Sequence, residues 1–167
     1  MKNKISVIVP TYNLNNYIVD CLNSIFNQTY KNIQVIVVND GSTDDTEVLL
    51  TNLLDPRLEI IRQENRGASH AKNKGLENAK GCYIQYLDAD DILSPDKIEK
   101  QILTIKSKKN TVAVCKTLVF VDDIENWTNE IDTDIDGDVL VMVGSELETI
   151  EITKTRSSIP QQQTKSR

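Results

Sequence analysis

Residues 33–42 have the sequence IQVIVVNDGS, in which the nearly continuous β-branched run Ile33–Val38 precedes Asp40 and Gly41. Runs of this kind are typical of parallel strands that helices cover on both faces. A glycine directly after the acid allows the chain to turn sharply. The stretch therefore predicts a central strand of an α/β sheet, with a carboxylate at its C-terminal end.

A second apolar run, Ile5–Val9, precedes this strand and predicts a neighbouring strand. Between the two runs, apolar residues from Ile18 to Phe26 recur at helical spacing, and we expect their helix to begin near Asn15 or Asn16. Strand and helix patterns continue in alternation: a helix after Ser42 or Thr43, a strand at Leu58–Ile61, a helix at Ala68–Ala79, a strand at Cys82–Leu87, a helix from Ser94-Pro95 to Lys106, and a strand at Thr111–Val121. This alternation predicts a doubly wound, mostly parallel α/β sheet with helices on both faces.

Composition divides the chain into three regions. We expect residues 1–121 to form the α/β region, residues 122–151 an acidic segment with one possible strand at 139–143, and residues 152–167 a flexible tail. The net charge is −6, and residues 111–151 hold 11 acidic and 1 basic side chains. Such a balance argues against nucleic acid as a partner.

The three cysteines, Cys21, Cys82 and Cys115, are widely spaced among apolar neighbours, which favours reduced thiols over a disulfide framework or a zinc site. The first residues hold no apolar stretch long enough for a signal peptide, and no run is long enough to cross a membrane. We therefore expect a cytoplasmic protein.

Acidic residues follow two of the predicted strands. In open α/β sheets, ligands collect at the carboxyl ends of the strands, where Asp40 and the Asp88–Asp91 cluster are expected. Asp88 and Asp90 alternate to one side of an extended chain, roughly 6–7 Å apart at Cα, which suits a hydrated divalent cation and its phosphate ligands. Taken alone, each acid could equally shape a turn or the start of the next helix.

Together, these acids and their spacing resemble the family 2 glycosyltransferases, inverting enzymes with a GT-A fold. Four segments carry the resemblance: Ser6–Asn13, Val37–Asp44, Asn65–Gly75 and Asp88–Asp91. It extends over about residues 4–120, so that residues 122–151 would form an incomplete acceptor half.

The resemblance implies a nucleotide-sugar donor, with uridine as the family's usual base. Pro10, Thr11 and Asp40 would line the base pocket, Asp88 would approach the ribose, Gly67 would let the backbone approach the donor, and Lys72 or Arg66 would lie near the phosphates.

The resemblance also implies a divalent metal, Mn²⁺ or Mg²⁺. Asp90, assisted by Asp91 or water, would hold the ion between the two phosphates. The bound ion would offset the charge that grows on the leaving group.

Two departures from the family pattern concern the chemistry. Lys72 stands where the family usually has arginine, which binds phosphate bidentately. The chain ends before the position of the family's catalytic base, and none of the acids at residues 132–138 matches its surroundings, so no catalytic residue is assigned. The only histidine, His70, is expected to be a packed or solvent-facing helix residue rather than a ligand or base.

The sequence therefore predicts a glycosyltransferase that transfers a sugar, with inversion, from a nucleotide-diphosphate sugar to a saccharide or lipid-linked acceptor. With a lipid-linked acceptor, the protein could associate with the inner face of the membrane. The alternative is a catalytically silent nucleotide-sugar binding module, or a truncated fragment without the base and acceptor site. A nucleotidylyltransferase is disfavoured because residues 10–13 replace the glycine-rich loop expected after its first strand.

Overall fold

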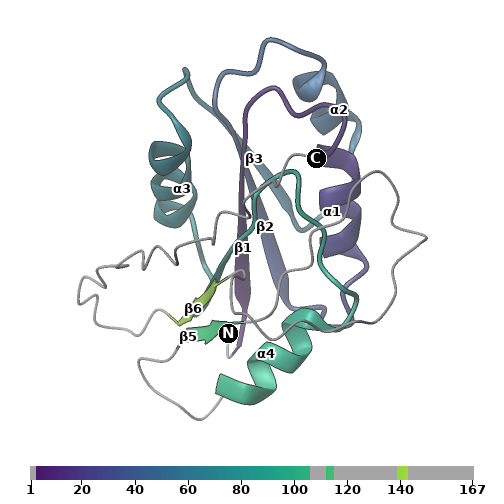
Figure 1. Ribbon diagram of the computed structural model, residues 1–167, viewed down its shortest axis with the longest axis vertical. Helices are drawn as coiled ribbons and strands as arrows, with labels where there is room; N and C mark the ends of the chain where they lie inside the picture. The colour runs from purple at the N-terminus through teal and green to yellow at the C-terminus, as the bar shows by residue number, and fades with distance from the viewer. Residues whose placement is uncertain (1–2, 106–111, 115–138, 143–167) are drawn as a thin grey trace, which may run out of the picture.

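The computed structural model describes residues 3–105, 112–114 and 139–142. They form one six-stranded sheet in the order β3-β2-β1-β4-β6-β5, flanked by four helices (Figure 1). The strands are β1 (Ile5–Thr11), β2 (Ile33–Asn39), β3 (Leu58–Arg62), β4 (Tyr83–Tyr86), β5 (Val112–Val114) and β6 (Val139–Met142). Strands β1 to β4 pair in parallel, which confirms the predicted fold class.

Strands β1 and β2 lie at the centre of the parallel part, and every residue in them is buried. Their register pairs Ile5 with Ile33 and Thr11 with Asn39, so both strands end at the same edge of the sheet. Burial on both faces explains why these strands consist of nearly continuous apolar residues rather than an alternating pattern.

Helices cover both faces of the sheet, with α3 on one side and α1 on the other (Figure 1). The helices are α1 (Ile18–Phe26), α2 (Thr46–Asn52), α3 (Ala68–Glu77) and α4 (Lys97–Ile105). Val7 and Val9 belong to the larger core cluster, with α1 and α4, whereas Ile8 packs on the other face with Ala71 of α3. A Cβ atom at Gly75 would lie 2.3 Å from Ile8 Cγ2, so α3 rests directly on β1.

Three helices begin later than the sequence predicts, one of them α4, which starts at Lys97 rather than at Pro95. Helix α1 starts at Ile18 rather than near Asn15 or Asn16, and α2 starts at Thr46 rather than directly after Ser42 or Thr43. The caps expected for α2 are engaged elsewhere: Ser42 Oγ accepts from the Asn13 backbone N–H at 3.1 Å, and the Thr43 hydroxyl donates to Asn13 Oδ1 at 3.4 Å. These side chains hold together the loops after β1 and β2.

The predicted strand at 139–143 is present as β6, which lies antiparallel between β4 and β5. Of the predicted strand at 111–121, the structure describes β5 alone, and the acidic stretch 122–138 and the tail 152–167 lie outside the described residues. Within the described part of the chain, no helix has the length and apolar character needed to cross a membrane.

Candidate functional site

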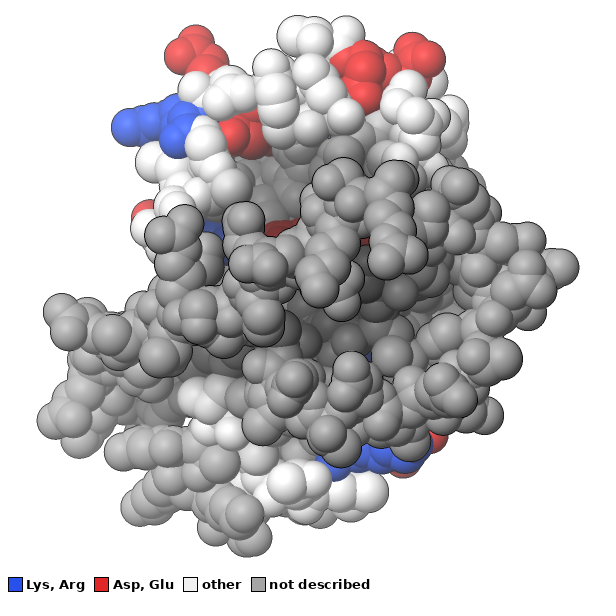
Figure 2. Space-filling model, in the orientation of Figure 1, with Lys and Arg blue, Asp and Glu red and all other residues white. Residues whose placement is uncertain are grey.

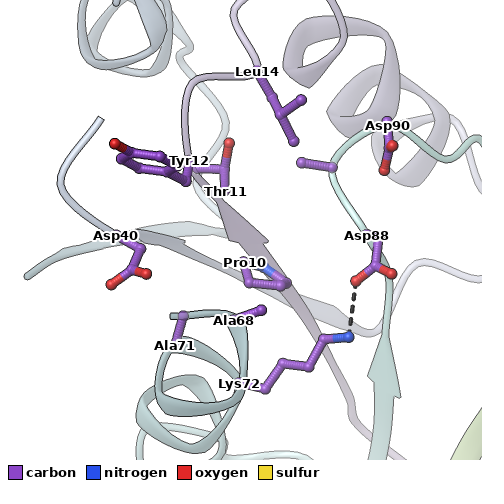
Figure 3. A pocket seen from close by; sticks show the side chains of 11 residues that line it. Pro10, Thr11, Tyr12, Leu14, Asp40, Ala68, Ala71, Lys72, Asp88 and Asp90 are labelled. Carbon is purple, nitrogen blue, oxygen red and sulfur yellow. Dashed lines mark ion pairs between the residues drawn. The ribbon is translucent and has the colours of Figure 1, made fainter. Parts of the chain in front are cut away.

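A pocket lies at the carboxyl ends of β1 and β4, beside the start of α3 (Figure 3). Its volume is about 290 Å³, and its lining consists of Pro10, Thr11, Tyr12, Leu14, Asp40, Ala68, Ala71, Lys72, Asp88, Ala89 and Asp90. Strand β1 is followed in space by β2 and β3 on one side and by β4 on the other. The pocket therefore occupies the switch point of the strand order, where open α/β sheets bind ligands.

Asp40, which directly follows β2, is only 3% exposed and accepts three hydrogen bonds. Its Oδ1 accepts from Gln63 Nε2 at 2.7 Å and from the Arg66 N–H at 2.9 Å, and its Oδ2 accepts from the Gly67 N–H at 2.8 Å. Burial alone would raise the pKa of Asp40, but these donors and the nearby His70 outweigh burial and hold the pKa below its usual value. Asp40 therefore stays ionised and fixes the loop before α3.

The donors leave Asp40 with limited capacity for a ligand. An ionised carboxylate has about four acceptor positions, two on each oxygen. Two donors occupy Oδ1 and one occupies Oδ2, so one position on Oδ2 is left to accept a hydrogen bond. The pocket therefore offers a single acceptor at this point.

Lys72 and Asp88 form an ion pair across the pocket, with Nζ 2.9 Å from Oδ1 (Figure 3). Helix α3 supplies the lysine, and the loop after β4 supplies the aspartate. Both side chains are partly exposed, at 34% and 58%. The pair places a mobile positive charge and carboxylate oxygens at the mouth of the same pocket.

Thr11, at the end of β1, has a hydroxyl that no described group satisfies. Its side chain is 2% exposed, and Oγ1 has no hydrogen-bond partner among the described residues. Because buried hydroxyls are nearly always hydrogen-bonded in native proteins, Thr11 Oγ1 has an unused hydrogen-bonding capacity beside the pocket that Thr11 lines.

Asp88 and Asp90 are the acidic side chains of the β4 loop that reach the pocket lining. Among the described residues, no group of three or more His, Cys, Asp and Glu side chains is arranged to hold a metal by protein ligands alone. Mg²⁺ and Mn²⁺ prefer oxygen ligands, and Mg²⁺ is usually held by one or two carboxylates together with substrate phosphates and water. The donor set therefore fits a metal that arrives with a diphosphate.

The structure brings together most of the residues singled out from the sequence. Pro10, Thr11, Asp40, Lys72, Asp88 and Asp90 line the pocket. Gly67 and Asp91 do not line it: the Gly67 N–H binds Asp40, and the Asp91 N–H binds the Asp88 carbonyl. Sequence reasoning missed Tyr12 and Gln63, although both directly follow strands and the strand-end rule could have included them.

The surface drawn in Figure 2 has acidic side chains along its upper edge, toward the carboxyl ends of the strands. On this face, Lys and Arg side chains of the described residues form no continuous patch. Of the described residues that line the pocket, Lys72 alone is a lysine or arginine.

Comparison with known proteins gives one family. The family model described as "Glycosyl transferase family 2" matches residues 6–162. The chain is 45% identical over 113 residues to glycosyltransferase GlyA of Streptococcus pneumoniae, covering 66% of this chain and 16% of GlyA. It is 36% identical over 133 residues to putative glycosyltransferase EpsH of Bacillus subtilis, covering 78% of this chain and 38% of EpsH. The chain thus spans well under half the length of these relatives.

Two solved structures resemble the fold. Staphylococcus aureus TarS 1–349 in complex with UDP-GlcNAc matches with a TM-score of 0.59 and 32% identity, over 65% of this chain and 33% of TarS. The mannosyltransferase PcManGT of Pyrobaculum calidifontis, in complex with GDP-Man and Mn²⁺, matches with a TM-score of 0.63 and 28% identity, over 71% of this chain and 36% of that protein.

Proposed function

This chain belongs to glycosyl transferase family 2, and we propose that it is the donor-binding region of an inverting glycosyltransferase that uses a nucleotide-diphosphate sugar. One observation carries the proposal: separate elements bring polar groups of complementary chemistry to one pocket. These groups are the ionised Asp40, the buried hydroxyl of Thr11, Lys72, and the carboxylates of Asp88 and Asp90. The pocket lies at the switch point of the sheet.

The single free acceptor of Asp40 favours uridine diphosphate over guanosine diphosphate. Uracil presents one N–H between two carbonyls, which one acceptor position on Oδ2 satisfies. Guanine presents two neighbouring N–H donors, which pair best with both oxygens of a carboxylate, and Oδ1 of Asp40 already accepts two hydrogen bonds. The similar structures hold either UDP-GlcNAc or GDP-Man, so this count is our reason for proposing a UDP-sugar.

The diphosphate would lie near Lys72 and the acids that follow β4. Lys72 can leave Asp88 and carry its charge to a phosphate oxygen, because the ion pair is partly exposed and so costs little to break. Asp88 would then be free to accept from a ribose hydroxyl. Asp90, with Asp91 or water, would hold a divalent cation, which when bound neutralises charge on the leaving diphosphate.

The rest of the reaction needs an acceptor and a general base. We assign donor binding to residues 1–121 and part of the acceptor side to residues 122–151, with no base named. A saccharide or lipid-linked acceptor would complete the reaction, and a lipid-linked one would bring the cytoplasmic chain to the inner face of the membrane.

Calorimetric titration of the full chain tests this proposal. We expect UDP and UDP-GlcNAc to bind in the presence of Mn²⁺, to bind more weakly with excess chelator, and to bind more tightly than GDP. Asp40→Ala and Asp90→Ala should weaken binding at least tenfold, whereas Asp20→Ala, on the exposed surface of α1, should leave it unchanged. Absence of binding to any nucleoside diphosphate by folded protein would refute the proposal.

A second measurement separates an enzyme from a silent binding module. Release of UDP from a UDP-sugar, with and without a pool of saccharide and lipid-linked acceptors, reports turnover. Acceptor-dependent release supports transfer. Binding without release under every condition supports the silent module.

A further inference from the structure

We propose that His70 is a positioning residue for Asp40: it holds the side-chain amide of Gln63 in the orientation that donates to Asp40, and thereby raises the affinity of the pocket for the nucleobase. The inference rests on the proposed function, in which the free acceptor of Asp40 binds the base. It concerns a residue of α3 that does not line the pocket itself.

Three side chains form a continuous chain of hydrogen bonds away from the pocket. Gln63 Nε2 donates to Asp40 Oδ1 at 2.7 Å, and Gln63 Oε1 lies 3.3 Å from His70 Nδ1. Gln63 comes just after β3, and His70 lies in the first turn of α3. The Gln63 amide thus connects Asp40 to His70 by hydrogen bonds.

The chemistry of the carboxylate fixes the direction of each bond. An ionised carboxylate only accepts, so Gln63 must turn its NH₂ group toward Asp40 and its carbonyl oxygen toward His70. Nδ1 of His70 must therefore carry a hydrogen and donate it to Gln63 Oε1. If the amide turned over, Oε1 would face Asp40 Oδ1, and two acceptors would oppose each other.

Solvent has access to Gln63 from a second depression, which does not share its lining with the pocket, and this access gives His70 its role. The depression is open, has a volume of about 430 Å³ and is lined by Gln63, Glu64, Arg66, His70, Lys74 and Glu77. In the described part of the chain, the Gln63 amide bonds to Asp40 and His70 and to none of the charged side chains of this depression. Without His70, Gln63 would keep its rotational freedom and exchange its bonds with water. His70 occupies the carbonyl oxygen and removes that freedom.

The electrostatic effect of His70 on Asp40 acts in the same sense as its hydrogen bond. The interaction with His70 is one of those that oppose the effect of burial on the pKa of Asp40. Both effects favour an ionised Asp40 with a fixed carboxylate plane. A fixed carboxylate keeps the remaining acceptor position on Oδ2 aimed in one direction.

Two substitutions of similar size separate the donor from the bulk of the side chain. His70→Asn keeps an N–H close to the position of Nδ1, whereas His70→Leu removes the donor and is a better helix former. By calorimetry of the full chain with UDP and Mn²⁺, we expect His70→Leu to raise Kd about three- to tenfold, the range for losing one hydrogen bond. His70→Asn should stay within about twofold of the wild type.

A double-mutant cycle tests whether His70 acts through Gln63. If it does, His70→Leu should add nothing to the loss that Gln63→Leu causes by itself. Additive losses overturn the inference, as does an unchanged Kd in His70→Leu or an equal loss in His70→Asn. Circular dichroism identifies a variant that fails to fold, and His70→Ala then replaces His70→Leu. If the wild type binds no nucleoside diphosphate, the proposed function fails and this inference fails with it. If the wild type and His70→Leu bind UDP equally well, the inference alone is refuted.

Discussion

Replacement of Asp40 by asparagine keeps the shape of the side chain but forces an NH₂ group against an N–H donor. If Nδ2 takes the place of Oδ2, it faces the Gly67 N–H; if it takes the place of Oδ1, it faces the Arg66 N–H. Gln63 can turn its amide over to adapt, but a backbone N–H cannot. In either orientation, one backbone donor loses a charged acceptor, which costs about 1.5–3 kcal/mol.

This cost should appear in thermal unfolding monitored by circular dichroism. At about 2–4 °C per kcal/mol for a chain of this length, Asp40→Asn lowers Tm by about 3–12 °C at pH 7. The control is Asp96→Asn, which breaks the exposed i,i+4 pair with Lys100 and should cost about 0.5 kcal/mol or less.

The pH dependence of the difference in Tm between wild type and Asp40→Asn tests whether the ionised carboxylate causes it. The pKa of Asp40 in the folded chain is below its usual value, so its stabilisation is complete well above about pH 4, where an unfolded aspartate is ionised. It is lost as the pH falls through the lower pKa of the folded state. The gap in Tm between wild type and Asp40→Asn should therefore persist from pH 6 to 8 and shrink as the pH falls below about 4. Equal Tm values at pH 7, or a gap that widens in acid, would refute the reasoning.

Three further substitutions have distinct expected outcomes. Thr11→Val removes a buried hydroxyl that has no partner among the described residues, so Tm should stay equal or rise while UDP affinity falls about fivefold in calorimetry; a lower Tm with unchanged affinity would contradict this. Lys72→Met breaks the partly exposed pair with Asp88 and should lower the free energy of unfolding in urea by less than about 1 kcal/mol. The same variant should bind UDP at least tenfold more weakly, whereas Lys72→Arg should retain binding. A large loss of stability in Lys72→Met would show that the pair is structural. Gly75→Ala drives a methyl into Ile8 and should destabilise the fold by about 1–3 kcal/mol, despite the better helix propensity of alanine; a variant as stable as wild type would disprove the close packing.

The central strands could be predicted from the sequence because burial on both faces leaves a direct mark on composition. The predicted runs Ile5–Val9 and Ile33–Val38 fall within β1 and β2, each of which extends slightly further. Strand β6 was also recognisable from its apolar run, but not its place in the sheet. Its partner β4 lies more than 50 residues earlier in the chain, and such pairing depends on the whole fold.

The helix starts could not be predicted, for a reason visible at Asn13 and Ser42. Capping rules consider residues within one helical turn, whereas the Ser42 hydroxyl accepts from the backbone N–H of Asn13, 29 residues away. The site shows the same division. The strand-end rule places Asp40 and Asp88 near one another, and the family resemblance adds Lys72. The three donors to Asp40, in contrast, come from residues 23 to 27 positions later.

Efforts to change the specificity of this scaffold meet a constraint at Asp40. The carboxylate that we propose binds the base also accepts the backbone hydrogen bonds that hold the loop before α3. Most variants of Asp40 in a mutant library would therefore be destabilised, whatever ligand they could bind. Tyr12 and Ala68 also line the pocket, but both are exposed, and neither has a side chain that holds a loop in place. Substitutions at these two positions can therefore change donor specificity without destabilising the loop before α3. In natural relatives, we expect ligand preference to change through such positions while Asp40 is retained.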